Sequence, residues 1–174
     1  MNLLTRRQFI KVGIAGAALF AAARYLDRPL AAPAEAYRVL DESSARITRA
    51  LIPVVLAGSL PREEIARVRA ISETLAAFDR AVSGLAPAVQ EELMQLFSFL
   101  SFAPSRVAFT GVWEPFEEAS RDDLKAFLTR WRHSRFDLQR QGYEALTQLI
   151  QAAWYDNPSS WKAIGYPGPP ALAT

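Results

Sequence analysis

Residues 65–82 of the 174-residue chain read IARVRAISETLAAFDRAV, and the spacing of their apolar side chains decides the fold class. The apolar positions are Ile65, Val68, Ile71, Leu75, Phe78 and Val82. Intervals of three and four residues place these side chains on one face of an α-helix. Pro61 and two glutamates precede the stretch and Ser83-Gly84 follows it, which is typical of a helix start and a helix end. The stretch therefore predicts a long amphipathic helix that begins at Pro61.

The same helical spacing recurs in four further stretches, and no part of the chain alternates like a half-buried β-strand. Helices are expected from Asp41 to a bend or end at Pro53, from Pro87 to Pro104, from a capping box at Ser120 and Asp123, and over residues 135–154. Residues 105–119 look irregular, with one helical turn before Gly111. We predict an all-α fold, a small helical bundle of about five helices. The expected core consists of Ile65, Val68, Leu75, Phe78, Leu93, Leu96, Phe97, Leu124, Leu128, Leu146 and Leu149.

The N-terminal residues read as a targeting segment. The run Thr5-Arg6-Arg7-Gln8-Phe9-Ile10-Lys11 is similar to the twin-arginine consensus Ser/Thr-Arg-Arg-x-Phe-Leu-Lys. An uncharged stretch follows over residues 12–23, shorter than the roughly 20 apolar residues that a membrane-spanning helix needs. We interpret Arg6, Arg7, Phe9 and Lys11 as the export signal.

Small residues at the end of this segment supply a cleavage site. Pro29 and Pro33 break any helix, and Ala34-Glu35-Ala36 offers Ala34 and Ala36 to a signal peptidase. The predicted division is a twin-arginine signal peptide over residues 1–36 and a helical domain over residues 37–174. Two alternatives remain open at this point: an ordinary N-terminal helix with a chance arginine pair, and a retained leader that anchors the chain to a membrane.

The net positive charge of the chain comes from the leader. The formal net charge is +2, and residues 1–36 hold five of the 20 basic side chains but only two of the 18 acidic ones. The remaining 15 basic and 16 acidic residues leave the domain near neutrality, so a nucleic-acid partner has no electrostatic support. The chain has no cysteine, which excludes disulfides, thiolate metal sites and covalently attached c-type haem.

Catalytic chemistry finds little support in the sequence. The lone histidine, His133, cannot form a two-histidine zinc site and stands where a helix ends. Acidic pairs occur at 63–64, 91–92, 117–118 and 122–123, and three of the four fall in predicted first turns of helices. Helix starts explain them better than catalysis, because sequence neighbours do not face one another on a helix. Arg130, Arg132, Arg135 and Arg140 form a basic run, either a solvated face or a contact for an anionic groove on a partner. We therefore predict no catalytic, cofactor-binding or metal-ligating residue in this chain.

The C-terminal segment over residues 154–170 combines prolines with large aromatic side chains. Proline stiffens an extended backbone before binding, and Trp and Tyr are typical interface anchors. We predict an extended docking tail. Its partner-contacting residues are Trp154, Tyr155, Trp161, Tyr166, Pro167, Pro169 and Pro170. The alternative is that the segment folds back and completes the core of its own domain.

Read together, the leader and the tail resemble those of the gluconate 2-dehydrogenase subunit 3 family. The likeness rests on residues 5–11, the helical middle, and Trp154-Tyr155-x-x-Pro158-x-x-Trp161 followed by Ile164-Gly165-Tyr166-Pro167-Gly168-Pro169-Pro170. The chain departs from the family at Leu40-Asp41-Glu42-Ser43-Ser44, where an opening of the type Leu-Thr-Pro-Glu-Glu is expected.

This resemblance implies a non-catalytic accessory subunit in the periplasm. Its partner would be a large subunit of the glucose-methanol-choline class that holds FAD, in some cases joined by a haem-bearing electron-transfer subunit. Twin-arginine translocase moves folded proteins, so a signal-less flavoprotein could cross while bound to this chain, and the complex or an uncleaved leader could associate with the membrane. Two rival hypotheses are a free-standing periplasmic helical binding module and a small enzyme that uses its own carboxylates.

Overall fold

A computed structural model describes residues 37–161, and within this range the chain forms helices and no β-strand. The long helices are α2 (Glu42–Val55), α3 (Glu64–Ser83), α4 (Pro87–Ser101), α6 (Arg121–Arg132) and α7 (Asp137–Tyr155). Three short elements accompany them: α5 (Ala103–Ser105), the π-helical turn η1 (Arg106–Thr110) and α8 (Pro158–Trp161). The prediction of an all-α fold with about five long helices is confirmed for the described residues.

The helices begin where local side chains can satisfy their free N–H groups. The Asp41 carboxylate accepts from the backbone N–H of Ser44 at 2.8 Å and caps α2, and the Ser120 hydroxyl accepts from Asp123 at 3.1 Å and caps α6. Both caps were predicted from the sequence. The start of α3 differs from the prediction, because Glu63 rather than Pro61 caps it, and its carboxylate accepts from the backbone N–H groups of Ile65 and Ala66.

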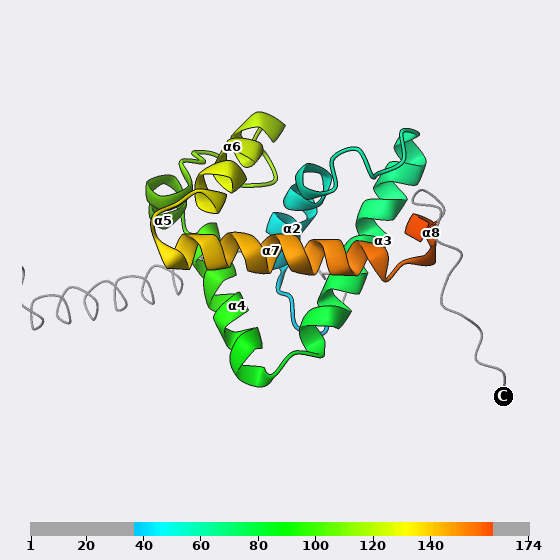
Figure 1. The fold of residues 1–174 in the computed structure, drawn as a ribbon, viewed down its shortest axis with the longest axis horizontal. Helices are drawn as coiled ribbons and strands as arrows, with labels where there is room; N and C mark the ends of the chain where they lie inside the picture. Colours follow the sequence, from blue (N-terminus) through cyan, green and yellow to red (C-terminus); the bar gives the residue numbers. More distant parts are fainter. Residues whose placement is uncertain (1–36, 162–174) are drawn as a thin grey trace, which may run out of the picture. The chain divides into compact units, whose positions relative to one another are not determined.

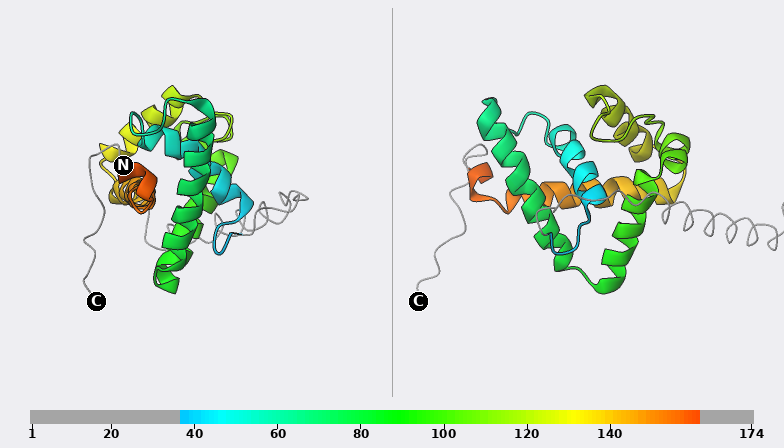
Figure 2. Two further views of the ribbon diagram at one scale, coloured as in Figure 1. Left: turned by 90° about the vertical axis from the view of Figure 1, so that its right-hand side faces the viewer. Right: turned by 180° about the vertical axis from the view of Figure 1, so that it is seen from behind.

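The helices pack around α2. This helix contacts α3, α4, α6 and α7, and Leu51 and Ile52 at its centre are fully buried. Helix α7 crosses the molecule in front of α2, while α3 and α4 diverge as a V from the turn that joins them (Figure 1). The other views show the same crossing from the side and from behind (Figure 2). The core therefore lies between α7 and the other helices, with α2 in the middle. None of the described helices is both long and apolar enough to span a membrane.

Most of the expected core is buried, and the exceptions lie at one end of α3. The buried members of that set are Leu75, Phe78, Leu93, Phe97, Leu124, Leu128 and Leu146, while Leu96 and Leu149 are half-buried. The prediction was wrong for Ile65 and Val68, which are 79% and 53% exposed. The buried face of α3 instead includes the small residues Ala70, Thr74 and Ala77. These small side chains allow close approach of a neighbouring helix. The first turns of α3, which carry Ile65 and Val68, remain exposed.

The two ends of α7 also differ in part from the expectation. Phe136 lies inside the range predicted for this helix, but it precedes the helix as its N-cap and is exposed. After Tyr155 the helix stops as predicted, but residues 158–161 then form one further helical turn, α8, rather than extended chain. Proline is well tolerated in the first turn of a helix, where its missing N–H is not needed, so Pro158 can begin α8.

A single buried carboxylate fixes the first described residues to α3. Asp79 accepts hydrogen bonds from the backbone N–H groups of Arg38, Val39 and Leu40 at 2.7, 3.0 and 3.0 Å. The Asp79 residue is only 4% exposed. Backbone donors bonded to an ionised acceptor form strong interactions, and buried donors left without an acceptor are costly. Asp79 thus joins the start of the domain to the middle of its core.

Replacing Asp79 by Ala should lower the free energy of unfolding by about 3 kcal/mol, because three N–H groups lose their acceptor at once. Asp79→Asn should cost less, since one amide oxygen can still accept. Urea unfolding followed by circular dichroism measures both variants. Glu91→Ala, which removes an exposed carboxylate on α4, is the control and should change stability by no more than about 0.5 kcal/mol. Equal stability of Asp79→Ala and Glu91→Ala would contradict the anchoring role.

Candidate interaction sites

The predicted site residues fall into two groups. Those of the leader (Arg6, Arg7, Phe9, Lys11, Ala34 and Ala36) and of the distal tail (Tyr166, Pro167, Pro169 and Pro170) lie outside the described residues. The structure describes Trp154, Tyr155 and Trp161. Trp154 is 3% exposed and belongs to the core, as the core-completion alternative predicts for this residue. Tyr155 remains exposed, and its carbonyl accepts from the indole N–H of Trp161 at 2.7 Å.

Polar contacts hold the beginning of the tail against α3. The Asn157 side-chain amide donates to the Glu73 carboxylate at 2.8 Å, a contact between residues 84 positions apart. Arg69 donates to the same carboxylate from its Nε at 2.8 Å. The Arg69 guanidinium, and after it the Asn157 amide, lower the pKa of Glu73 from its usual value. Glu73 therefore stays ionised to lower pH than an ordinary glutamate and keeps residue 157 attached to α3.

The four arginines of the basic run do not form one surface. Arg130 donates to the Thr110 carbonyl, and Arg140 donates to the Ser134 carbonyl at 2.6 Å and pairs with Asp137. Arg135 lies over the ring of Phe136, 4.9 Å from its centroid. Arg132 instead lines a groove between three helices. The interpretation of the run as a solvated face is thus too simple, because three of its members hold local structure.

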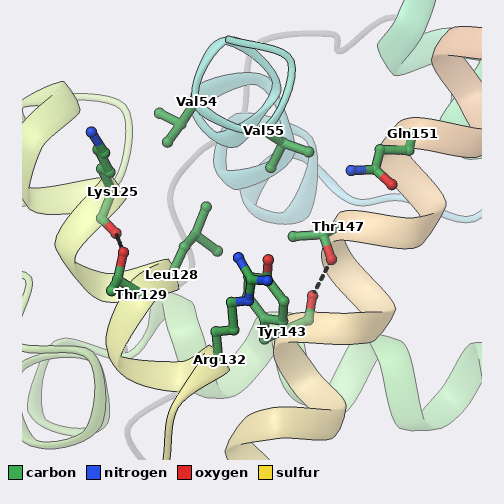
Figure 3. Close-up of a pocket in the computed structure, with 9 residues that line it drawn as sticks. All are labelled: Val54, Val55, Lys125, Leu128, Thr129, Arg132, Tyr143, Thr147 and Gln151. Atoms are coloured by element: carbon green, nitrogen blue, oxygen red, sulfur yellow. Dashed lines mark hydrogen bonds between the residues drawn. The ribbon is translucent and has the colours of Figure 1, made fainter.

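The groove that Arg132 enters lies between α2, α6 and α7 (Figure 3). Its volume is about 170 Å³. The lining consists of Val54 and Val55 from α2, Lys125, Leu128, Thr129 and Arg132 from α6, and Tyr143, Thr147 and Gln151 from α7. Among these described lining residues two are cations and none is acidic. The groove therefore favours an anionic group with a small apolar body.

A second candidate site is the loop that follows α5, in the region predicted to be irregular. The helical turn expected before Gly111 is present as η1, and Gly111 has a positive φ of 66°. Beyond it Trp113 is 79% exposed. The guanidinium of Arg106 donates to the Trp113 carbonyl at 3.1 Å and to the Ser101 carbonyl at 3.2 Å. The sequence could not identify Trp113 as a surface residue, because its exposure depends on hydrogen bonds that form only when the loop has folded.

The same loop is tied to α6 and α7 through Trp131. This residue is 2% exposed, and its indole N–H donates to the Phe109 carbonyl at 3.1 Å. Its ring packs so closely on α7 that a Cβ added at Gly142 would lie 2.5 Å from Cζ3 of Trp131. Glycine at position 142 thus allows Trp131 to hold the backbone of η1.

The residues considered for catalysis lie apart from both sites. His133 is exposed and forms the C-cap of α6, as its solvated interpretation predicts. The acidic pairs at 63–64 and 122–123 do occupy helix starts, but the pair at 91–92 does not, since α4 has no acid in its first turn. Within the described residues no group of three or more His, Cys, Asp or Glu side chains is placed to hold a metal ion.

Comparisons with known proteins add no further constraint. No protein-family model matches the chain, and neither the curated proteins nor the solved structures contain a significant match. Inference about function therefore rests on the residues themselves, their geometry and the resemblance of the leader and the tail.

Gly142→Ala should destabilise the domain by roughly 1–3 kcal/mol, because the new methyl group overlaps a rigid buried indole. Helix propensity alone predicts the opposite sign, since alanine is favoured over glycine by about 1 kcal/mol within a helix. Thermal unfolding followed by circular dichroism distinguishes the two expectations. Gly84→Ala is the matched control, because a Cβ there would meet its nearest atom at an ordinary 3.5 Å. A raised melting temperature in Gly142→Ala would show that Trp131 can shift without cost.

Proposed function

We propose that this chain is a non-catalytic accessory subunit of a periplasmic FAD-dependent dehydrogenase. It supplies the export signal and stabilises the flavoprotein subunit, whose reaction uses FAD bound in that partner. The leader motif and the tail motif, both quoted above, support the assignment through their resemblance to the gluconate 2-dehydrogenase subunit 3 family. Association with a haem-bearing subunit and with the membrane follows from the same resemblance.

The observation that carries the interaction role is the exposure of Trp113 on a loop whose backbone is already fixed. An exposed tryptophan is unusual on a monomer, because this side chain has a large apolar surface and is enriched at interfaces. Its backbone carbonyl is held by Arg106, so little additional ordering is required when a partner covers the ring. A surface of this kind supports a binding role for the domain.

The export route agrees with a binding role. Twin-arginine translocase moves proteins that have folded before export, often because a cofactor must first be inserted. No cofactor site was predicted from the sequence of this domain, so its use of the route is best explained by a bound partner that carries the cofactor. The translocase and the flavoprotein are then the two partners of the chain.

A free-standing binding module is the second candidate, and the groove between α2, α6 and α7 favours it. A small acid could occupy the groove with its carboxylate near Lys125 or Arg132. The volume of about 170 Å³ lies below the roughly 300–1,000 Å³ of most sites for drug-sized ligands. A larger cavity of about 510 Å³ beside α3 falls within that range, so we rank this function second only because the leader and tail motifs support the accessory subunit.

Replacing Arg6 and Arg7 together by Lys should abolish export of both this chain and its flavoprotein, because lysine does not reproduce the planar guanidinium pair. The measurement is fractionation of native-host cells, with immunodetection of this chain and flavin fluorescence of the periplasmic fraction. The unaltered chain, purified from the same cells, should bring a yellow protein with it in near-equal amount.

The outcomes of this experiment separate its two parts. Normal export of the double variant would refute the twin-arginine assignment. Stranding of this chain alone, with the flavoprotein still exported, would refute joint transport. Recovery of the unaltered chain as a colourless monomer would refute the accessory role and leave the binding module as the better proposal.

Replacing Trp161 and Tyr166 together by Ala should reduce recovery of the flavoprotein at least tenfold, since loss of an aromatic anchor typically costs about 2 kcal/mol or more. The helical content of the isolated chain should stay nearly unchanged, as measured by circular dichroism. Val89→Ala, which shortens an exposed side chain on α4, serves as the control. A large fall in melting temperature, with partner recovery lost only above that temperature, would instead support core completion by the tail.

A further inference from the structure

We propose that Trp113 and Glu114 dock into an apolar pocket with a basic rim on the flavoprotein subunit. This inference rests on the proposed function and names the contact through which the two chains recognise each other. Both residues lie outside the sequence range predicted for the docking tail.

The backbone on both sides of Trp113 is anchored in the core. Val112 is buried next to it in the chain, and Phe116 is buried three residues later. The ring of Phe116 meets Phe127 of α6 edge-on, with 5.5 Å between the centroids. With both neighbouring anchors facing inward, Trp113 and Glu114 are held at the surface and exposed.

Hydrogen bonds fix the approach to this exposed pair. The Thr110 hydroxyl donates to the Arg106 carbonyl at 2.6 Å and accepts from the Val112 N–H at 3.1 Å. Arg130 from α6 donates to the Thr110 carbonyl. A Cβ at Gly111 would lie 2.7 Å from that guanidinium, so glycine provides both the positive φ and the space for Arg130. The loop is therefore formed before any partner binds.

The buried Arg106 side chain also holds this loop in place. It is 7% exposed, and within residues 37–161 its hydrogen bonds reach two carbonyls and no carboxylate. Its Nε has no acceptor in that part of the chain. Burying a guanidinium without a counter-charge is costly. The only hydrogen bonds that offset this cost within the described residues are those to the Ser101 and Trp113 carbonyls. Arg106 is thus a positioning residue for Trp113.

The chemistry of the loop defines the surface that it fits. The indole of Trp113 requires an apolar pocket. Glu114 is exposed beside it and forms no ion pair within the described residues, whereas Glu117 is paired with Arg46. Arg106 is buried, so the exposed charge that adjoins Trp113 in the chain is the Glu114 carboxylate. The other nearby cation, Arg130, is held against Gly111 by its hydrogen bond to the Thr110 carbonyl. A complementary partner surface carries lysine or arginine at the rim of its pocket, which favours correct encounter and register.

Binding of the purified, co-purifying flavoprotein to variants of the mature chain tests this contact by surface plasmon resonance. Trp113→Ala should weaken binding at least tenfold, and Glu114→Lys should weaken it severalfold and most strongly at low salt. Two exposed residues on other helices provide matched controls. Ile65→Ala removes an equally exposed apolar side chain from α3, and Glu91→Lys makes the same charge change on α4. Both controls should bind like the unaltered chain.

The role of Arg106 is tested by coupling. Arg106→Met should weaken binding to a similar extent as Trp113→Ala, and the double variant should be no weaker than Trp113→Ala alone, because both changes remove one contact. Additive losses would show that Arg106 affects binding independently of Trp113 and does not position it. Since Arg106→Met can impair folding, Trp113→Ala decides the docking contact independently.

The results also distinguish this inference from the proposed function. If the flavoprotein binds the unaltered chain and Trp113→Ala equally well, the docking contact is wrong and the accessory role stands. If no flavoprotein co-purifies with the unaltered chain, both are wrong. If the isolated chain self-associates and Trp113→Ala makes it monomeric in analytical ultracentrifugation, the loop binds a second copy and the inference is overturned.

Discussion

Three backbone N–H groups converge on the Asp79 carboxylate, and the rest of the domain depends on this contact. It seats residues 38–40 against α3 and brings Leu40 into the core. Asp41 follows at once and caps α2, the helix that contacts most of the others. One buried acceptor therefore determines where the central helix begins. It also fixes the first described residues of the domain to the middle of α3.

The sequence predicted those parts of the fold that local chemistry controls. Caps at Asp41 and Ser120 depend on side chains within three residues of the helix start, and both are present. The apolar stripe of α6 is buried as expected. The stripe of α3 failed at Ile65 and Val68, because periodicity gives the apolar face of a helix but not the length of the neighbour that covers it. The buried side of α3 also includes the small residues Ala70, Thr74 and Ala77, which carry a weak hydrophobic signal.

The candidate sites were harder to predict because they depend on contacts that form only in the folded domain. A tryptophan in sequence can fill a core or project from a surface, and this chain contains both cases in Trp154 and Trp113. Composition treats them alike. The two tryptophans differ in whether the backbone beside them directs the side chain into the core or toward solvent. For Trp113 this direction is set by the hydrogen bond from Arg106 and by the buried neighbours Val112 and Phe116. The arginines of the basic run also differ in role, because Arg130 donates a hydrogen bond to the loop at Thr110 while Arg132 lines the groove between α2, α6 and α7.

Under the accessory role proposed above, the chain would bind its partner before export, and its binding surface would have to be complete as soon as the domain has folded. Flexible segments lose part of their interaction free energy in becoming ordered, whereas the loop at 106–113 is ordered by its own hydrogen bonds. Ordering the loop in this way lowers the stability of the domain, because Arg106 is buried without a carboxylate partner in the described residues. Stability given up at such a position is typical of a functional surface. The π-helical turn, the left-handed glycine and the buried guanidinium are therefore explained together, as the means of presenting one exposed indole in a fixed orientation.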